Sequence, residues 1–196
     1  CLKKLKITKM KRIFDLLFSI FLGMFLLIPF LLFIIFLKIF SSGPIFYISK
    51  RIGKNKKIFD MIKLRTMKEG TPPVNTNDLT NVQEHVTKFG KILRKYSIDE
   101  IPQILNVLVG DMSFVGPRPA LENQDLLIAE RDRFNIHELK PGITGLAQIN
   151  GRDMINLEKK VYYDNLYKIK QSFFFDIKIL IKTFKNVIFS KGVKHW

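Results

Sequence analysis

The stretch LLFSIFLGMFLLIPFLLFIIFL, residues 16–37, carries no charge and is long enough to decide how the chain begins its fold. As a helix it would extend about 33 Å, which is enough to cross a bilayer. Pro29 interrupts the run, because proline removes a backbone donor and disfavours a helical conformation at Ile28. The first expectation is therefore a membrane helix with a break at Ile28 and Pro29.

The charges on both sides of this run favour a hairpin over a simple span. Lysine and arginine residues cluster before the run, at 3–12, and after it, at 38–57. Positively charged flanks tend to stay in the cytoplasm. Arms of about 20 Å and about 12 Å would then enter one leaflet and leave by the same face. We predict this re-entrant helix-break-helix, with a kinked transmembrane anchor as the alternative.

The composition limits the class of protein. The chain has 196 residues, of which 47% are hydrophobic, and a net charge of +16 at pH 7. This length fits one compact domain with an attached segment, and the apolar content excludes a disordered protein. The charge requires an anionic partner, such as nucleic acid, anionic lipid or a phosphorylated small substrate. With Cys1 as the only cysteine, an internal disulfide is excluded.

After the turn signal Ser41-Ser42-Gly43-Pro44, the pattern changes to short strands and helices. Strands are expected at 44–48 and 57–67, and helices at 86–95, 101–109 and 121–131. The sequence thus predicts a mixed α/β fold, mostly helical with short strands. It divides the chain into a membrane hairpin at 1–42 and a second domain at 43–196.

The last predicted helix, at 173–189, has an amphipathic pattern. Phe173, Ile177, Leu180, Phe184 and Val187 repeat at helical spacing, and a second stripe holds three lysines. Such a helix can lie in the membrane interface with its lysines at the headgroups. Packing of the apolar stripe on the domain core is the alternative, and the pattern alone does not separate the two.

The strongest candidates for chemistry are Asp99 and Glu100, in SIDEIPQILNVL. Pro102 is tolerated only in the first turn of a helix, so it places both carboxylates at a helix start, where they can reach one site. The structural alternative is a capping box, because Ser97 and Glu100 have its spacing. By itself the pair fits the structural reading better.

Basic residues form the second candidate group. Arg118 stands between Pro117 and Pro119, which restrict its backbone and suit bidentate binding of phosphate oxygens. The other members of the group are Lys63, Arg65, Arg94 and Arg152. Each alone could be a solvated turn or surface residue, but the combination with an acidic pair and a membrane hairpin favours an anion site.

Four segments together carry a resemblance to a known family. They are KRIFDLL (11–17), IKLRTM (62–67), SIDEIPQILNVLVGDMSFVGPRPALE (97–122) and KPGITGLAQINGR (140–152). In this order they resemble the bacterial sugar transferase family, the small monotopic phosphoglycosyl transferases. The match extends over almost the whole chain, and the run from Asp99 to Pro119 is the most specific part.

The resemblance implies a function and roles for individual residues. It implies a cytoplasmic catalytic domain with interfacial helices on the bacterial inner membrane, and Mg²⁺-dependent transfer of a sugar 1-phosphate from a UDP-sugar to polyprenol phosphate. Asp99 would be the nucleophile and a metal neighbour, and Glu100 would hold the metal. Arg118 would bind the phosphates of the donor, with Lys63, Arg94 and Arg152 as further phosphate ligands.

Two other classes of function remain open on the sequence. A membrane-anchored protein that binds anionic polymers fits the charge, but the chain lacks a recognisable nucleic-acid motif, so no nucleic-acid partner is expected. A structural membrane adaptor fits the hairpin. Neither would release a nucleoside monophosphate from a nucleotide sugar. The sequence defines neither the sugar, nor the glycan, nor the oligomeric state.

Overall fold

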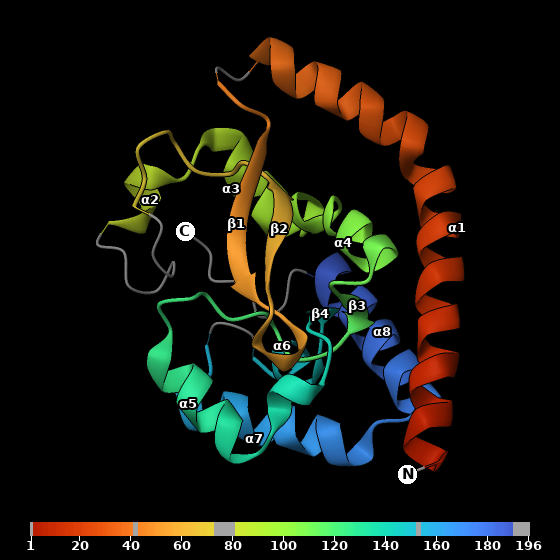
Figure 1. Ribbon diagram of the computed structural model, residues 1–196. Coiled ribbons are helices and arrows are strands. Elements are labelled where there is room, and N and C mark those ends of the chain that lie inside the picture. Colours follow the sequence, from red (N-terminus) through yellow and green to blue (C-terminus); the bar gives the residue numbers. More distant parts are fainter. Residues whose placement is uncertain (1, 41–42, 73–80, 152–153, 190–196) are drawn as a thin grey trace.

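The computed structural model describes residues 2–40, 43–72, 81–151 and 154–189. Its fold is mixed α/β and mostly helical with short strands, as the sequence predicts (Figure 1). The elements in chain order are α1 (Leu2–Phe40), β1 (Phe46–Ile52), η1 (Lys54–Lys56), β2 (Ile58–Leu64), α2 (Val82–His85), α3 (Lys88–Lys95), η3 (Ile98–Glu100), α4 (Gln103–Val109), β3 (Ser113–Val115), α5 (Asp125–Arg133), η4 (Ile136–Glu138), β4 (Gly142–Thr144), α6 (Leu146–Ile149), α7 (Leu157–Lys170) and α8 (Phe173–Ile188).

Helix α1 continues through Ile28 and Pro29 and is not interrupted there. Figure 1 shows that it changes direction partway along its length. An internal proline removes one helical hydrogen bond and crowds the preceding turn, which bends a helix whose other bonds persist. From Ile7 to Phe40 the helix is long and apolar enough to cross a membrane, and only 6% of its most apolar stretch is buried.

Both arms of α1 pack against the rest of the chain. In the first arm, Arg12 donates hydrogen bonds to the carbonyl oxygens of Val107 (2.6 Å) and Leu108 (2.8 Å) at the end of α4. In the second arm, Leu37 is buried with Leu64 of β2 and Leu93 of α3. The helix therefore contacts one folded unit at both of its ends.

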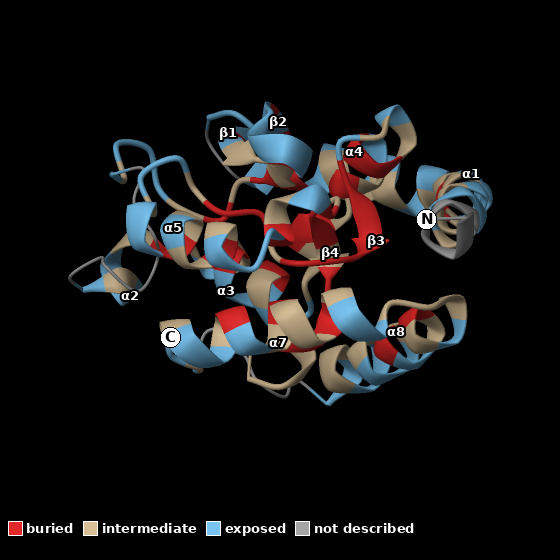
Figure 2. Ribbon diagram, turned by 60° about the horizontal axis from the view of Figure 1, so that its bottom comes forward, coloured by how far each residue is buried: buried red, intermediate tan, exposed pale blue. Residues whose placement is uncertain are grey.

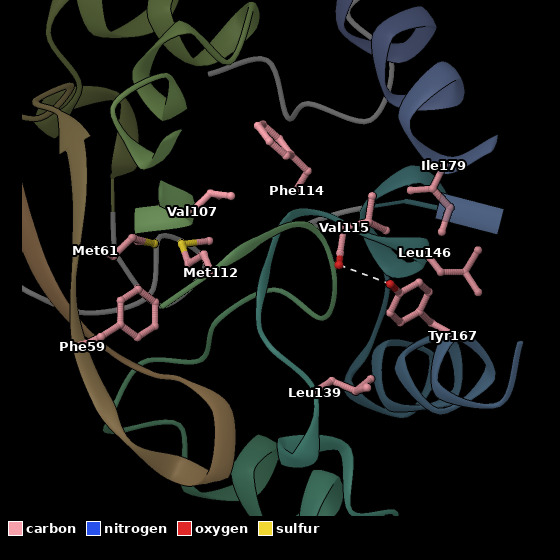
Figure 3. Close-up of a cluster of buried hydrophobic side chains, with 10 residues drawn as sticks. All are labelled: Phe59, Met61, Val107, Met112, Phe114, Val115, Leu139, Leu146, Tyr167 and Ile179. Atoms are coloured by element: carbon pink, nitrogen blue, oxygen red, sulfur yellow. Dashed lines mark hydrogen bonds between the residues drawn. The ribbon is translucent and has the colours of Figure 1, made fainter. Parts of the chain in front are cut away.

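A polar cluster fixes the start of α1 to the C-terminal helices. Lys11 forms a salt bridge with Asp176 of α8 and a 3.0 Å hydrogen bond with the hydroxyl of Tyr167 on α7. The same hydroxyl lies 2.7 Å from Asp176 Oδ1 and 3.2 Å from the carbonyl oxygen of Val115 (Figure 3). Because Val115 ends β3, this cluster connects α1 with the chain that leads to Arg118.

Two small sheets organise the remaining helices. Strands β1 and β2 form an antiparallel hairpin with Ile48 opposite Ile62. Both predicted strands are present, but β1 begins at Phe46 and runs on to Ile52, and β2 ends at Leu64, three residues earlier than predicted. Strands β3 and β4 pair in parallel, with Ser113 opposite Gly142. Figure 2 shows buried residues concentrated around this second sheet, and Figure 3 shows the largest apolar cluster gathered there.

The predicted helices are present. Helix α8 begins at Phe173 as predicted, whereas α3, α4 and α5 begin two to four residues later, and local side chains explain two of these shifts. Helix α3 begins at Lys88 because Thr87 caps it, accepting a hydrogen bond from the amide of Gly90 at 2.9 Å. Helix α5 begins at Asp125 because Gln124 Oε1 binds the amide of Leu121 at 2.9 Å and holds that segment in a turn. Helix α7 was not predicted.

Helix α8 has both a buried face and an exposed apolar face. Ile179 and Asp176 are buried against the domain. On the opposite side, Phe174, Ile181 and Phe184 are each more than half exposed. One face of α8 is therefore a core face, and an exposed apolar face remains beside its lysines.

Candidate functional site

The carboxylate pair lies on a single short turn, η3. Ser97 precedes this turn in the left-handed region, with φ 54°, and makes no side-chain cap hydrogen bond. The capping-box alternative is therefore wrong. Asp99 and Glu100 are instead buried, with exposures of 6% and 7%. Since buried carboxylates are costly without compensating partners, their surroundings decide what they can do.

Asn106 holds this turn beside strand β2. Its side-chain nitrogen donates to the carbonyl oxygen of Asp60 (2.7 Å), and its oxygen accepts from the amide of Ile62 (3.1 Å). The amide thus replaces a missing strand partner and ties α4 to β2. Because α4 directly follows the carboxylate pair, this brace places Glu100 next to Lys63 of β2.

Two predicted cations converge on Glu100. Arg118 places Nη1 and Nη2 each 3.2 Å from Glu100 Oε1, and Lys63 Nζ lies 3.4 Å from the same oxygen. Lys63 is nearly buried, whereas the side chain of Arg118 is 37% exposed. One carboxylate oxygen is therefore shared by two positive groups, and Arg118 retains exposed surface for a ligand.

The loop that carries Arg118 is held from behind. Arg131 of α5 donates to the carbonyl oxygen of Arg118 at 2.9 Å, and its Nε and Nη2 bind Asp164 of α7 at 3.0 and 2.6 Å. On the other side, Gly116 passes so close to Gly142 that a Cβ on either residue would collide with the backbone of the other segment. Position and direction of Arg118 are thus determined by its neighbours.

A third cation, Arg51 of β1, was missed by the sequence analysis. Burial and the charge of Arg118 lower its pKa to about 10, and the nearby Glu100 partly offsets this. Burial lowers the pKa of Lys63 to about 8, with Glu100 opposing and the two arginines adding to the shift. Three cations thus lie around Glu100, and an anionic ligand would relieve the repulsion among them.

The three other basic residues singled out in the sequence are Arg94, Arg65 and Arg152. Arg94 of α3 donates from Nε to Thr66 Oγ1 at 2.9 Å, in the segment that follows β2. Arg65 pairs with the exposed Glu69 at 2.9 Å. Arg152 falls outside the residues that the structure describes.

The chemistry of this donor set fits Mg²⁺ when a phosphorylated ligand contributes. Within the described ranges, no group of three His, Cys, Asp or Glu residues could hold a metal ion. Mg²⁺ commonly takes only one or two carboxylates and completes its shell with water and substrate phosphates. Asp99 and Glu100 supply that number of carboxylates on one turn.

Comparison with known proteins identifies the class. The model of the bacterial sugar transferase family matches residues 6–190. The sugar transferase EpsL of Bacillus subtilis is 44% identical over 185 residues, covering 94% of this chain and 90% of the relative. The exopolysaccharide production protein ExoY of Sinorhizobium fredii is 37% identical, covering 93% and 87%. The chain therefore belongs to the bacterial sugar transferase family, which confirms the resemblance.

A further relative has a more informative name. The undecaprenyl-phosphate galactose phosphotransferase of Salmonella typhimurium is 34% identical over 201 residues. The alignment covers 93% of this chain and 41% of that longer protein. The aligned region spans the positions of Asp99 and Glu100, because it covers almost all of this chain.

Proposed function

We propose that this chain is a membrane phosphosugar transferase that moves a sugar 1-phosphate from a UDP-sugar to polyprenol phosphate. The observation that carries the proposal is the convergence of Lys63 and Arg118 on Glu100, next to Asp99 and beside an apolar membrane helix. Relatives named for undecaprenyl-phosphate galactose and glucose phosphotransfer support the substrate class.

The proposed reaction has two steps. A carboxylate oxygen of Asp99 attacks the phosphorus that carries the sugar, and the bond from that phosphorus to the bridging oxygen breaks, so UMP leaves with the electron pair. A phosphate oxygen of polyprenol phosphate then attacks the same phosphorus. The bond to Asp99 breaks, which restores the carboxylate and yields a polyprenyl diphosphosugar.

The cations make this attack possible, since a carboxylate and a diphosphate repel each other. Arg118 presents a planar fork suited to two phosphate oxygens, and Lys63 and Arg51 add positive charge behind it. A Mg²⁺ ion held by Asp99, Glu100 and the diphosphate would supply further charge neutralisation. Glu100 also fixes Lys63 and Arg118 in place.

The first test is a panel of UDP-sugars, each incubated with the full chain in detergent and Mg²⁺. A phosphosugar transferase of this kind releases UMP with at least one of them and forms a lipid product when undecaprenyl phosphate is added. A membrane adaptor or a protein that binds anionic polymers releases none. The absence of UMP across the panel contradicts the proposal.

Arg118→Lys is expected to lower turnover about a hundredfold, because the charge remains but the planar fork that positions phosphate is lost. The comparison is Arg133→Lys, on the exposed surface of α5, which should retain full turnover. Thermal unfolding of both variants verifies the fold. Near-normal turnover of Arg118→Lys would remove this side chain from the phosphate site.

The membrane topology proposed for α1 is re-entrant, with the domain at the cytoplasmic face. Straight, its 39 residues would extend about 58 Å. Both arms nevertheless contact the same folded unit, through Arg12 and Leu37. A straight crossing of the bilayer would separate those ends by the thickness of the membrane. The exposed apolar surface between them includes Leu17, Ile20, Phe21, Met24, Phe25, Ile28, Leu32 and Ile35.

Cysteine labelling in intact cells tests this topology. With Cys1 replaced by serine, single cysteines at the exposed positions Lys9 and Lys54 should both react only after the membrane is made permeable. Labelling of Lys9→Cys from outside would show that α1 crosses the membrane. Pro29→Leu should increase that outside fraction, because an unbent apolar helix matches the hydrocarbon thickness.

A further inference from the structure

A cavity of about 240 Å³ adjoins the carboxylate pair on the side of the membrane helix. Glu100 and Arg118 contribute its charged wall. Much of the rest is apolar and includes Leu22 and Leu26 of α1, Ile104 of α4 and Val187 of α8. Phe21 and Phe25, next to the two leucines, are exposed on α1, so the membrane-facing surface and the cavity wall belong to the same helix segment.

Gln148 is the unusual polar residue of this cavity. Both its side-chain nitrogen and its side-chain oxygen are buried, and neither has a hydrogen-bond partner in the part of the chain that the structure describes. The oxygen lies beside Gly145, which approaches Gly116 two residues before Arg118. A buried amide without partners destabilises the fold, so its presence points to a ligand that binds it.

We propose that this cavity holds the phosphate-bearing end of the polyprenol phosphate acceptor, an assignment that rests on the proposed function. Arg118 and the side-chain nitrogen of Gln148 bind phosphate oxygens of the acceptor. The first isoprene units lie along Leu22, Leu26 and Val187. The volume is below the roughly 300 Å³ of pockets that hold drug-sized ligands, so only the start of the long chain fits and the rest stays in the lipid.

The wall chemistry favours the lipid acceptor over the sugar of the donor. A sugar presents a hydroxyl on nearly every carbon, and each buried hydroxyl needs a hydrogen-bond partner. The two threonines that line the cavity, Thr144 and Thr183, already bind each other at 2.7 Å. The donor would approach instead from the side of Lys63 and Arg51, where the cations lie on strands β1 and β2.

Filling the cavity separates the two half-reactions. Val187→Trp should raise the KM for undecaprenyl phosphate at least about tenfold, which corresponds to the loss of about two buried methylenes. UMP release from the UDP-sugar alone should proceed as in the wild type. Ile188→Trp is the matched control, one residue further along α8 on an exposed position outside the cavity wall, and should match the wild type in both assays.

A second variant covers the case in which Val187→Trp does not fold. Gln148→Leu keeps the size of the side chain and removes the amide, and Gln148→Glu adds a negative charge. The KM for undecaprenyl phosphate should rise in Gln148→Leu, because the amide that binds the phosphate is lost. It should rise further in Gln148→Glu, because the carboxylate repels the phosphate. A KM that stays within about twofold in the folded variants overturns the assignment, since that change is only about 0.4 kcal/mol.

The two half-reactions also distinguish failure of this inference from failure of the proposed function. Equal losses of donor-only UMP release and of lipid transfer in the Gln148 variants would assign the cavity to the donor and overturn the proposal. If the wild-type protein itself releases no UMP from any UDP-sugar, the proposed function fails as a whole.

Discussion

Asp99→Asn is expected to abolish UMP release from a UDP-sugar alone and to lower overall transfer by at least about three orders of magnitude. An amide oxygen is a poor nucleophile and cannot form an acyl phosphate, so the first step stops before the donor bond breaks. The substitution keeps the shape of a side chain that is 6% exposed, and the fold around η3 should persist.

The measurement is a donor-only burst combined with intact-mass analysis. The wild type should release up to one equivalent of UMP and gain the mass of one phosphosugar, whereas Asp99→Asn should show neither. Asp125→Asn, at the exposed start of α5, makes the same chemical change away from the site and should behave like the wild type.

Glu100→Gln separates the nucleophile from the residue that orders the site. It removes the charge that Lys63 and Arg118 share, so activity should fall strongly, but Asp99 remains able to form the adduct. Added Mg²⁺ should recover part of the activity if Glu100 holds the metal. A phosphosugar adduct that persists on Asp99→Asn would move the nucleophile to another residue.

The hairpin strands and the position of the carboxylate pair could be predicted from local patterns. Alternation of basic and apolar residues marks β2, and Pro102 restricts where α4 can begin, so Asp99 and Glu100 had to precede it. The pattern could not separate a capping box from a buried functional pair. That choice depends on the left-handed conformation of Ser97, which no spacing in the sequence reveals.

Other features lacked a local signal. Strand β3 has only three residues, too short for periodicity to appear. Helix α7 buries Asp164 and Tyr167 alongside Val161, so its core face is partly polar and does not read as an apolar stripe. Arg51 resembles any basic residue on an edge strand until the fold brings it near Arg118.

The attachment of α1 was also beyond sequence reasoning. The basic flanks and Pro29 predicted a break at Ile28 and Pro29, which is wrong, because α1 bends but continues as one helix through Pro29 (Figure 1). Which residues hold the two arms depends on contacts with distant segments, such as those of Arg12 with α4 and of Leu37 with β2 and α3. Long-range pairs of this kind carry no spacing that a single sequence reveals.

Asp164→Leu is expected to destabilise the fold by about 3–5 kcal/mol, because it leaves the guanidinium of Arg131 buried without its carboxylate. The side chains of Arg131 and Asp164 are only 5% and 2% exposed. For comparison, Arg133→Met removes the exposed salt bridge with Glu130 on α5 and should lower the free energy of unfolding by at most about 1 kcal/mol. Denaturant unfolding in detergent measures the free energy of unfolding of both variants. A decrease below about 1 kcal/mol for Asp164→Leu would contradict the importance of the buried salt bridge.

The double variant Arg131→Met with Asp164→Leu separates stability from positioning. Replacing both partners with apolar residues of similar volume should recover most of the stability. Turnover should nevertheless stay about tenfold or more below the wild type. The carbonyl oxygen of Arg118 loses the donor that fixes its loop, so the guanidinium of Arg118 is no longer held toward the phosphates. The defect should appear in donor-only UMP release, since Arg118 acts in the first step. A double variant that regains both stability and full turnover would show that Arg131 supports the fold without positioning Arg118, and that Gly116 with its close neighbours suffices to aim this loop.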